Sequence, residues 1–260
     1  PNIKEVIVDK RLSRFNLIYL FSLMKKIKQH KFTKVYDLQN SSRTSFYKRI
    51  VFPNLGSYKW SSSETTLPAN ETKKEFDKKP VLERFDHQLK ISGLKTFHTL
   101  KPDFSWGCSN IDKLISKYNL SDYILLFPFC SEHLQQKKWP YYDQLIKLIK
   151  QNHPNLKIVI APGPDEIEKA KKLDAVSILK EDKAISISEL AGLIKRSKFV
   201  VANDTGPAHM ASHLNVKGLS LFGSHTTAHK VSIERENFKA IQVSDLKNLS
   251  AEKVFERLVL

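Results

Sequence analysis

The stretch from 198 to 227, KFVVANDTGPAHMASHLNVKGLSLFGSHTT, constrains the fold more than any other part of the chain. An apolar run at 199–202 is followed by a turn, a short helical segment opened by Pro207, and a second apolar run at 218–222. Proline suits the first helical position, where its missing N–H and fixed φ cost nothing. Two strands joined by a single helix predict a parallel βαβ unit.

The turn after the first of these strands carries small polar residues, with His209 one helical turn beyond it. A helix N-terminus offers unpaired N–H groups to an anion, and Gly206 lets a ligand approach the backbone closely. Open α/β sheets bind ligands at the carboxyl ends of their strands. The sequence therefore predicts an anion-binding pocket formed by Asn203, Asp204, Thr205, Gly206 and His209.

The rest of the second half alternates apolar runs with amphipathic ones. This alternation predicts a parallel, doubly wound sheet with right-handed crossovers. Strands are expected at 123–129, 156–161, 176–179, 199–202, 218–222 and 240–243, and helices at 140–151, 165–173, 187–197 and 251–258.

The first half alternates less regularly. Expected there are strands at 6–8 and 35–38 and helices at 15–28, 81–91 and 111–118. The apolar part of the helix at 15–28 favours packing against a sheet, with a membrane-surface helix as the alternative. The Ser- and Thr-rich text at 59–79 has no clear period and predicts a long mobile loop. We place the boundary between two domains near residue 110, dividing the chain into 1–110 and 111–260.

Charge and cysteine content narrow the classes of function. The 260 residues include 43 Lys and Arg against 27 Asp and Glu, a net charge of +16, which predicts an anionic partner or else a solvated basic face. Cys108 and Cys130 lack the spacing of a metal site or a disulfide framework. No apolar run is long enough to span a bilayer. A nucleic-acid partner is not expected, because no aromatic–basic stacking motif is present.

The loops after the predicted parallel strands should meet at one edge of the sheet. Hydroxyl groups and glycine N–H groups suit phosphate, Lys138 supplies a charge, and an acidic residue suits a ribose. Neither the P-loop nor the G-x-G-x-x-G motif is present, which argues against ATP hydrolysis and dinucleotide chemistry. Taken singly, Lys138, Asp204 and His209 also fit a surface lysine, a helix cap and a structural histidine. Further candidates at this edge are Ser131, Asp165, Glu166, Gly223 and Ser224.

A second polar cluster, QNSSR, follows the strand expected at 35–38. Gln39 and Arg43 are candidates for holding a polar acceptor, since a guanidinium pairs well with phosphate or carboxylate. The same cluster also fits an ordinary helix cap.

The run NDTGPAHMA at 203–211, followed by LFGS at 221–224, resembles the signature of glycosyltransferase family 9, the bacterial lipopolysaccharide heptosyltransferases. KKWP at 137–140 is similar to that family's basic-Trp-Pro entry to a helix, and ISELA at 187–191 to its lead-in. The resemblance is strong from 123 to 260 and extends to the first half only in layout.

This resemblance implies a GT-B-type α/β enzyme, with two Rossmann-like domains that have parallel sheets and face a cleft. It implies no cofactor and no metal, an ADP-heptose donor on the C-terminal domain, and a lipopolysaccharide inner-core acceptor on the N-terminal domain. Ser131 and Lys138 would contact the diphosphate, and Asp165 or Glu166 the ribose. Asp204, Thr205, Gly206 and His209 would hold sugar and phosphate, with Lys138, Asp204 and His209 as the catalytic group.

The sequence departs from the family pattern at two places. The family's candidate base lies in a Gly-Asp loop, and this chain has no glycine before Gly56, so the N-terminal domain is expected to lack its first strand. The segment from Gly223 to Thr227 departs from the family's Gly-Pro-Thr, because Ser224 and His225 replace the proline. The expected function is an inverting glycosyltransferase, cytoplasmic and peripheral on an anionic membrane. The alternatives are an inactive sugar-nucleotide-binding module and an enzyme using another sugar nucleotide.

Overall fold

The computed structural model describes residues 3–52 and 59–260. The chain divides into two compact units: unit 1 comprises Pro1–Lys79 and Glu83–Phe97, and unit 2 comprises Pro80–Leu82 and His98–Leu260. Residue 110, where the sequence analysis placed the domain boundary, lies inside unit 2, and the division at that residue stays a prediction.

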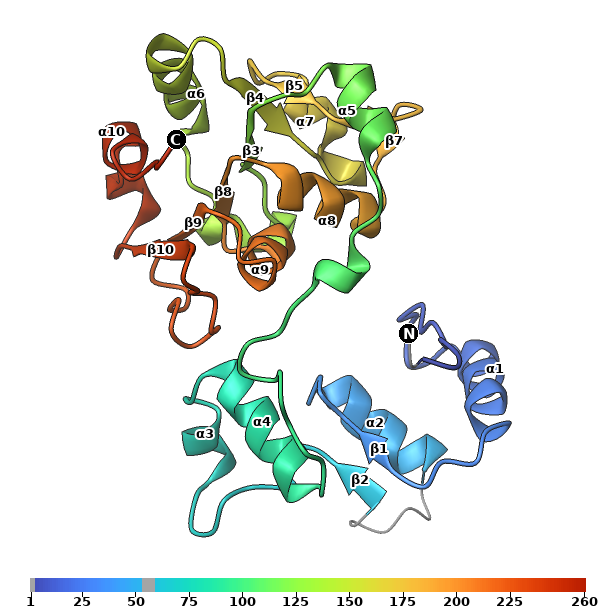
Figure 1. Cartoon of the computed structure of the whole chain (residues 1–260). Coiled ribbons are helices and arrows are strands. Elements are labelled where there is room, and N and C mark those ends of the chain that lie inside the picture. The colour runs from blue at the N-terminus through green and yellow to red at the C-terminus, as the bar shows by residue number, and fades with distance from the viewer. Residues whose placement is uncertain (1–2, 53–58) are drawn as a thin grey trace. The chain divides into compact units, whose positions relative to one another are not determined.

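Unit 2 is built on a six-stranded parallel sheet, as the alternating pattern predicted (Figure 1). From one edge to the other the strands are β10 (Phe238–Gln242), β9 (Gly218–Phe222), β8 (Phe199–Asn203), β3 (Tyr123–Phe127), β4 (Lys157–Ile160) and β5 (Val176–Ser177). The chain runs outward from β3 through β4 to β5 and then resumes at β8 on the other side of β3. The carboxyl ends of β3 and β8 therefore form a topological switch point, where α/β sheets bind ligands.

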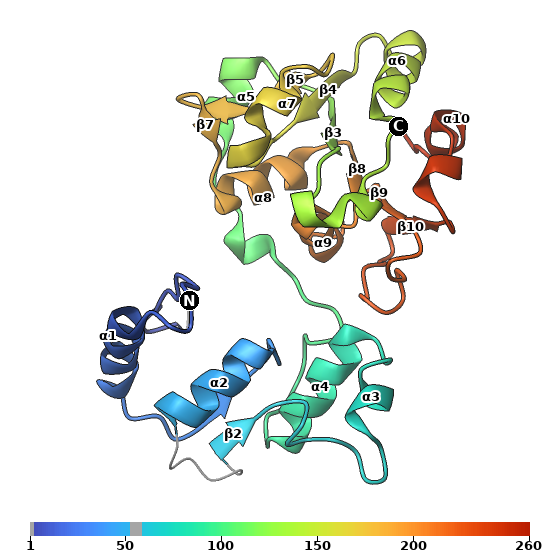
Figure 2. The ribbon, with the colours of Figure 1, turned by 180° about the vertical axis from the view of Figure 1, so that it is seen from behind.

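Helices cover both faces of this sheet, as the two opposite views show (Figures 1 and 2). Side chains of β3 alternate between the two cores: Tyr123, Leu125 and Phe127 pack into one, and Ile124 and Leu126 into the other. Burial on both faces explains why these strands are uninterrupted apolar runs. The first core is completed by α5 (Asp112–Tyr118), α8 (Ile187–Arg196) and α9 (Gly206–His213), and the second by α6 (Tyr142–Asn152), α7 (Ile167–Ala170) and α10 (Ala251–Phe255).

The strand expected at 176–179 is divided in the structure. Its first part is β5, while β6 (Leu179–Lys180) turns back to pair with β7 (Lys183–Ala184) in an antiparallel hairpin. Glu181 and Asp182, at φ 51° and 59°, form the left-handed turn of this hairpin. Short 3₁₀ segments, η2 (Ser105–Gly107), η3 (Glu132–Lys137), η4 (Pro164–Glu166) and η5 (Leu246–Asn248), lie in the connections.

Unit 1 has less regular structure than the sequence predicted. Its described strands, β1 (Val35–Tyr36) and β2 (Trp60–Ser61), pair in parallel, and its helices are α1 (Leu17–Lys28), α2 (Ser42–Val51), α3 (Lys73–Phe76) and most of α4 (Val81–Ile91). The strand expected at 6–8 is absent from the described residues, and Val6 and Val8 are 72% and 74% exposed. The loop expected at 59–79 was also wrong in part, because β2 and α3 lie within it.

Helix α1 is less buried than the sequence predicted, which favoured packing of this nearly all-apolar helix against a sheet. Leu20 and Leu23 are buried, whereas Leu17, Ile18 and Phe21 are exposed. The helix begins at an Asn16 cap that accepts the backbone N–H of Tyr19, and it ends in a basic last turn. In this structure α1 therefore buries a single stripe of its surface.

Candidate functional site

Two cavities of unit 2 lie at the carboxyl ends of β3 and β4. One, of about 490 Å³, extends from Phe127 and Ser131 to Pro207 at the start of α9. The second, of about 530 Å³, shares Ser131 and Glu166 with the first. These cavities lie at the switch point of the sheet, which is where the anion-binding turn was expected.

Asp204, which directly precedes the cavity-lining Thr205, is the centre of a cluster of ionisable side chains. Its carboxylate is 4% exposed and lies 2.7 Å from Lys137 Nζ, 3.0 Å from His225 Nε2 and 3.5 Å from His209 Nε2. Burial by itself would raise the pKa of Asp204, but the interactions with His209, Lys137 and His225 outweigh it and hold that pKa well below its ordinary value. Asp204 is therefore ionised at neutral pH and fixed from three sides.

Lys137, rather than Lys138, reaches this carboxylate. The backbone leaves η3 in an extended conformation at Lys138, so successive side chains point to opposite sides. Trp139 and Lys137 point inward, and Trp139 is fully buried, whereas Lys138 is exposed. Lys137 was not among the residues selected from the sequence, because its inward direction depends on the burial of Trp139 two residues later. A diphosphate contact by Lys138 stays a prediction.

Asn203 holds the loop that carries Lys137. Its fully buried side-chain oxygen accepts the backbone N–H of Trp139 at 3.1 Å and the hydroxyl of Tyr142 at 3.4 Å. Its amide nitrogen donates to the carbonyl of Phe129 at 3.4 Å. The end of β8 is thereby joined to both ends of the connection between β3 and α6.

The start of α9 has the geometry expected of a helix N-terminus open to a ligand. Thr205 caps the helix in an extended conformation without a side-chain cap bond, and its hydroxyl lies 3.2 Å from the carbonyl of Asn203. A Cβ built on Gly206 would meet no atom within 4 Å, so the space above its backbone is open. Within the first helical turn Pro207 has no N–H and Ala208 donates its N–H to the carbonyl of Thr205 at 3.1 Å, so the N–H of Gly206, below the open space, is the one placed to meet a phosphate.

The walls of the first cavity are largely apolar, with Phe129, Ile187 and Leu190 among them. Flat apolar walls beside a few polar groups suit a nucleobase. The two acidic candidates differ in which cavity they line: Glu166 lines both, whereas Asp165 lines only the second. The carboxylate of Glu166 accepts the backbone N–H of Gly163 at 2.8 Å. Ser131, also a candidate, is exposed and lines both.

The loop after β9 contributes a residue that the sequence analysis did not select. Gly223 is buried and Ser224 is exposed. His225, two residues beyond Gly223, is the side chain that turns in to Asp204. The signal for it was present in the sequence, since Ser224 and His225 replace the proline of the family's Gly-Pro-Thr pattern.

The two acceptor candidates lie in unit 1, after β1. The guanidinium of Arg43 is 3.0 Å from the carboxylate of Asp9 and also bonds to the hydroxyl of Tyr47 at 2.7 Å. Gln39 donates its backbone N–H to Asp37, in a turn that precedes the Ser41 cap of α2. Arg43 is therefore held by unit 1 itself, and acceptor binding by either residue stays a prediction.

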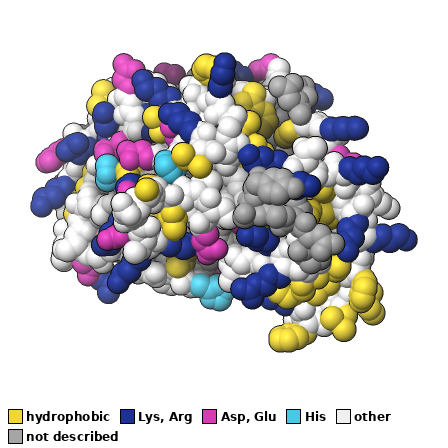
Figure 3. Space-filling view, turned by 90° about the horizontal axis from the view of Figure 1, so that it is seen from below, with side chains coloured by type: hydrophobic (Ala, Val, Ile, Leu, Met, Phe, Trp, Pro, Cys, Tyr) yellow, Lys and Arg dark blue, Asp and Glu magenta, His cyan; other side chains and the backbone are white. Residues whose placement is uncertain are grey.

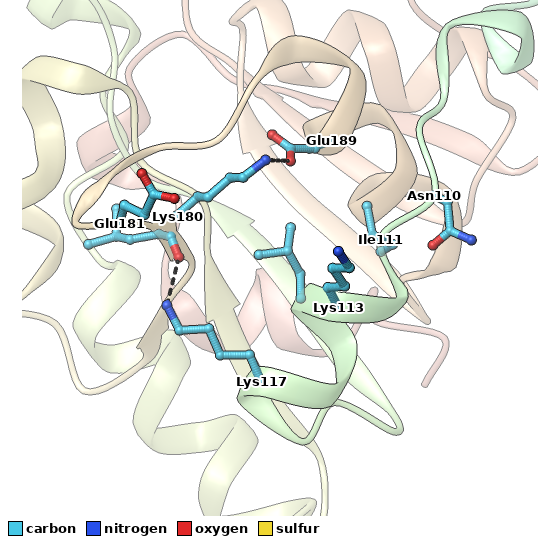
Figure 4. Close-up of a pocket in the computed structure, with 9 residues that line it drawn as sticks. Asn110, Ile111, Lys113, Lys117, Lys180, Glu181 and Glu189 are labelled. Atoms are coloured by element: carbon cyan, nitrogen blue, oxygen red, sulfur yellow. Dashed lines mark hydrogen bonds and ion pairs between the residues drawn. The ribbon is translucent and has the colours of Figure 1, made fainter.

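Another cavity of about 520 Å³ lies between α5, the β6–β7 hairpin and α8 (Figure 4). Lys180 points across it to Glu189 at 2.7 Å, and Lys117 donates to the carbonyl of Leu179. These polar groups satisfy one another, in contrast to the open helix N-terminus of α9. No cluster of three or more His, Cys, Asp or Glu side chains in the described part of the chain is arranged to hold a metal ion.

A doubly wound parallel sheet with an open helix N-terminus and a charged cluster at its switch point defines an α/β domain of the nucleotide-binding class. The chain belongs to glycosyltransferase family 9 (heptosyltransferase), whose family model matches residues 20–258. The resemblance seen in the sequence is thereby confirmed.

A curated relative and solved structures agree with this assignment. Lipopolysaccharide heptosyltransferase 1 of Campylobacter coli is 29% identical over 114 residues, which cover 40% of this chain and 33% of that protein. The match thus spans about a third of the relative's length. The Veillonella parvula family 9 structure superposes with a TM-score of 0.70 at 17% identity, covering 99% of this chain and 82% of that one. E. coli heptosyltransferase WaaC with ADP gives 0.64 at 18% identity, covering 94% and 77%. The expected GT-B-type α/β fold is confirmed.

Proposed function

We propose that the chain is a glycosyltransferase that moves a heptose, or a related sugar, from an ADP-sugar to a lipopolysaccharide inner-core acceptor with inversion at the anomeric carbon. The observation that carries the proposal is the Lys137–Asp204 pair, at 2.7 Å, which directly precedes Thr205 in the wall of an apolar cavity at the switch point of the sheet. The C. coli relative, named as a lipopolysaccharide heptosyltransferase, supports the choice of sugar and acceptor.

The donor would lie across the strand ends with its adenine in the apolar cavity. Glu166, which lines both cavities, is placed to meet the ribose hydroxyls, and Ser131 and Thr205 offer hydroxyls to the diphosphate. Asp204 and His209 would then hold the sugar hydroxyls. The solved WaaC structure carries ADP, which supports an adenine nucleotide as the ligand class.

Transfer to the acceptor leaves the nucleoside diphosphate as the leaving group, and its growing negative charge must be stabilised. Lys137, which is held near the start of α9 by Asp204, and the N-terminus of α9 are the donors available for that charge. Preorganised charges of this kind stabilise a transition state more than they stabilise the substrate. We therefore propose that transfer does not depend on a metal ion.

The proposed acceptor is a lipid-linked anionic saccharide at the cytoplasmic face of a membrane. The net charge of +16 supports attraction to such a surface, and on the face shown in Figure 3 Lys and Arg side chains are widely scattered. The described helices include none long and apolar enough to cross a bilayer. Sedimentation with vesicles tests the peripheral attachment: binding to phosphatidylglycerol vesicles but not to phosphatidylcholine vesicles is expected.

Titration calorimetry with ADP, UDP and GDP tests the donor. Binding of ADP at least about tenfold tighter than UDP or GDP, a difference of roughly 1.4 kcal/mol or more, is expected if the apolar cavity holds adenine as proposed. Tighter binding of UDP or GDP would favour the alternative of another sugar nucleotide. ADP binding without transfer to an inner-core acceptor would favour the alternative of an inactive binding module.

A further inference from the structure

His225 places a second histidine on the carboxylate of Asp204. Its side chain is only 7% exposed, and its Nε2 lies 3.0 Å from Asp204 Oδ2. The ring stacks on Phe222, with centroids 6.0 Å apart and planes at 13°. Both the contact and the orientation of the ring are therefore fixed by buried structure.

The surroundings of the ring indicate which nitrogen carries its proton. His225 Nδ1 is buried and has no hydrogen-bond partner among the residues that the structure describes. A proton on Nδ1 would leave a buried donor unsatisfied, and it would also turn the lone pair of Nε2 toward the carboxylate of Asp204. The tautomer that fits carries its proton on Nε2 and donates it to Asp204.

Lys137 and His225 bond to the same oxygen of Asp204, Oδ2. A diphosphate bound at the start of α9 would compete with Asp204 for the ammonium of Lys137. Once Lys137 turns to the phosphates, a carboxylate that is 4% exposed cannot rely on water for compensation. The side chains left to satisfy it are His225, from the loop after β9, and His209, from α9.

We propose that His225 is a positioning residue, which holds Asp204 ionised and in place while Lys137 is transferred from this carboxylate to the diphosphate of the donor. The inference rests on the proposed function, since it needs a nucleoside diphosphate at this site. His225 acts through Asp204 and contacts no substrate itself. Its effect should therefore vanish when the carboxylate is removed.

Calorimetric titration with ADP tests this in four single variants and one double variant. His225→Leu should weaken ADP binding by about 10- to 100-fold, the equivalent of one hydrogen bond to a charged group. His225→Gln, whose amide N–H can take the place of Nε2–H, should stay within about threefold of the wild type. The matched control is His229→Leu, an exposed histidine of the same loop, which should bind ADP as the wild type does. Asp204→Asn supplies the background for the double variant.

In the Asp204→Asn background, His225→Leu should change ADP affinity by less than about twofold, because coupled residues are not additive. An equal loss in both backgrounds, or no loss in either, would overturn the inference. If His225→Leu does not fold, His225→Asn replaces it, since its shorter amide cannot reach Asp204. Failure of the wild-type chain to bind ADP would overturn the proposed function as well, whereas normal wild-type binding with a silent His225→Leu overturns only the role of His225.

Discussion

Asn203 and Trp139 fix the register of the candidate site: the side-chain oxygen of Asn203 accepts the backbone N–H of Trp139 at 3.1 Å. Asp204, the first residue after β8, bonds to Lys137, two residues before Trp139. The successive residues Asn203 and Asp204 thus bond to Trp139 and Lys137, which are two residues apart in the loop after β3. This double attachment brings a lysine from the β3 loop onto the carboxylate that follows β8.

The first prediction concerns this attachment. Asn203→Ala should lower the free energy of unfolding by about 1 to 3 kcal/mol, because it leaves the buried N–H of Trp139 without an acceptor. It should also weaken ADP binding, since Lys137 loses its support. Urea denaturation and calorimetry measure the two effects. Gln151→Ala, on an exposed position of α6, is the control and should change stability by no more than about 0.5 kcal/mol.

The second prediction separates two adjacent lysines. Lys137→Met should weaken ADP binding by about tenfold or more, because an ammonium next to phosphate contributes a charge-assisted hydrogen bond. Lys138→Met should change the affinity by no more than about twofold, since an exposed charge is screened by solvent. Calorimetry at one ionic strength measures both. A larger effect from Lys138 would restore the assignment made from the sequence.

The third prediction concerns metal ions. ADP affinity and sugar transfer should be the same with and without EDTA, because Lys137 and the N-terminus of α9 supply the positive charge. The measurement is a titration after dialysis against EDTA, repeated with added Mg²⁺. A loss of affinity in EDTA that Mg²⁺ reverses would contradict metal-independent transfer.

The fourth prediction is a dependence of stability on pH. Burial lowers the pKa of His213 to about 4, helped by the positive charges of Arg235 and His209. Between pH 6.5 and 4 the unfolded chain binds a proton at this residue that the folded chain does not, so stability should fall as the pH falls. The loss should reach at most about 1.4 kcal/mol per pH unit.

His213→Gln should remove this part of the pH dependence, as urea unfolding at several pH values would reveal. Asp204 contributes in a separate range: its pKa is lowered by folding, so its contribution is present above its ordinary value of 3.8 and is lost only at lower pH. Equal slopes between pH 6.5 and 4 for wild type and His213→Gln would contradict the assignment.

The strand pattern of unit 2 was predictable because every residue of β3, β8 and β9 is buried. Strands buried on both faces must be continuous apolar runs, and such runs are visible in a sequence. Unit 1 was less predictable because its strands lack this signal: β1 and β2 are each only two residues long, too short to form a recognisable apolar run. The strand expected at 6–8 shows that β-branched residues alone do not make a strand.

The sequence by itself determined the family and the turn from Asn203 to Gly206, because a proline-opened helix after a buried strand depends on local propensity and short spacing. Only the tertiary structure decided which side chains meet at Asp204. Lys137 and His225 lie 67 and 21 residues from it in the chain, and their contacts depend on strand order and on the burial of Trp139 and Phe222. The direction in which a loop side chain points follows from what packs beneath it, and no local pattern encodes that.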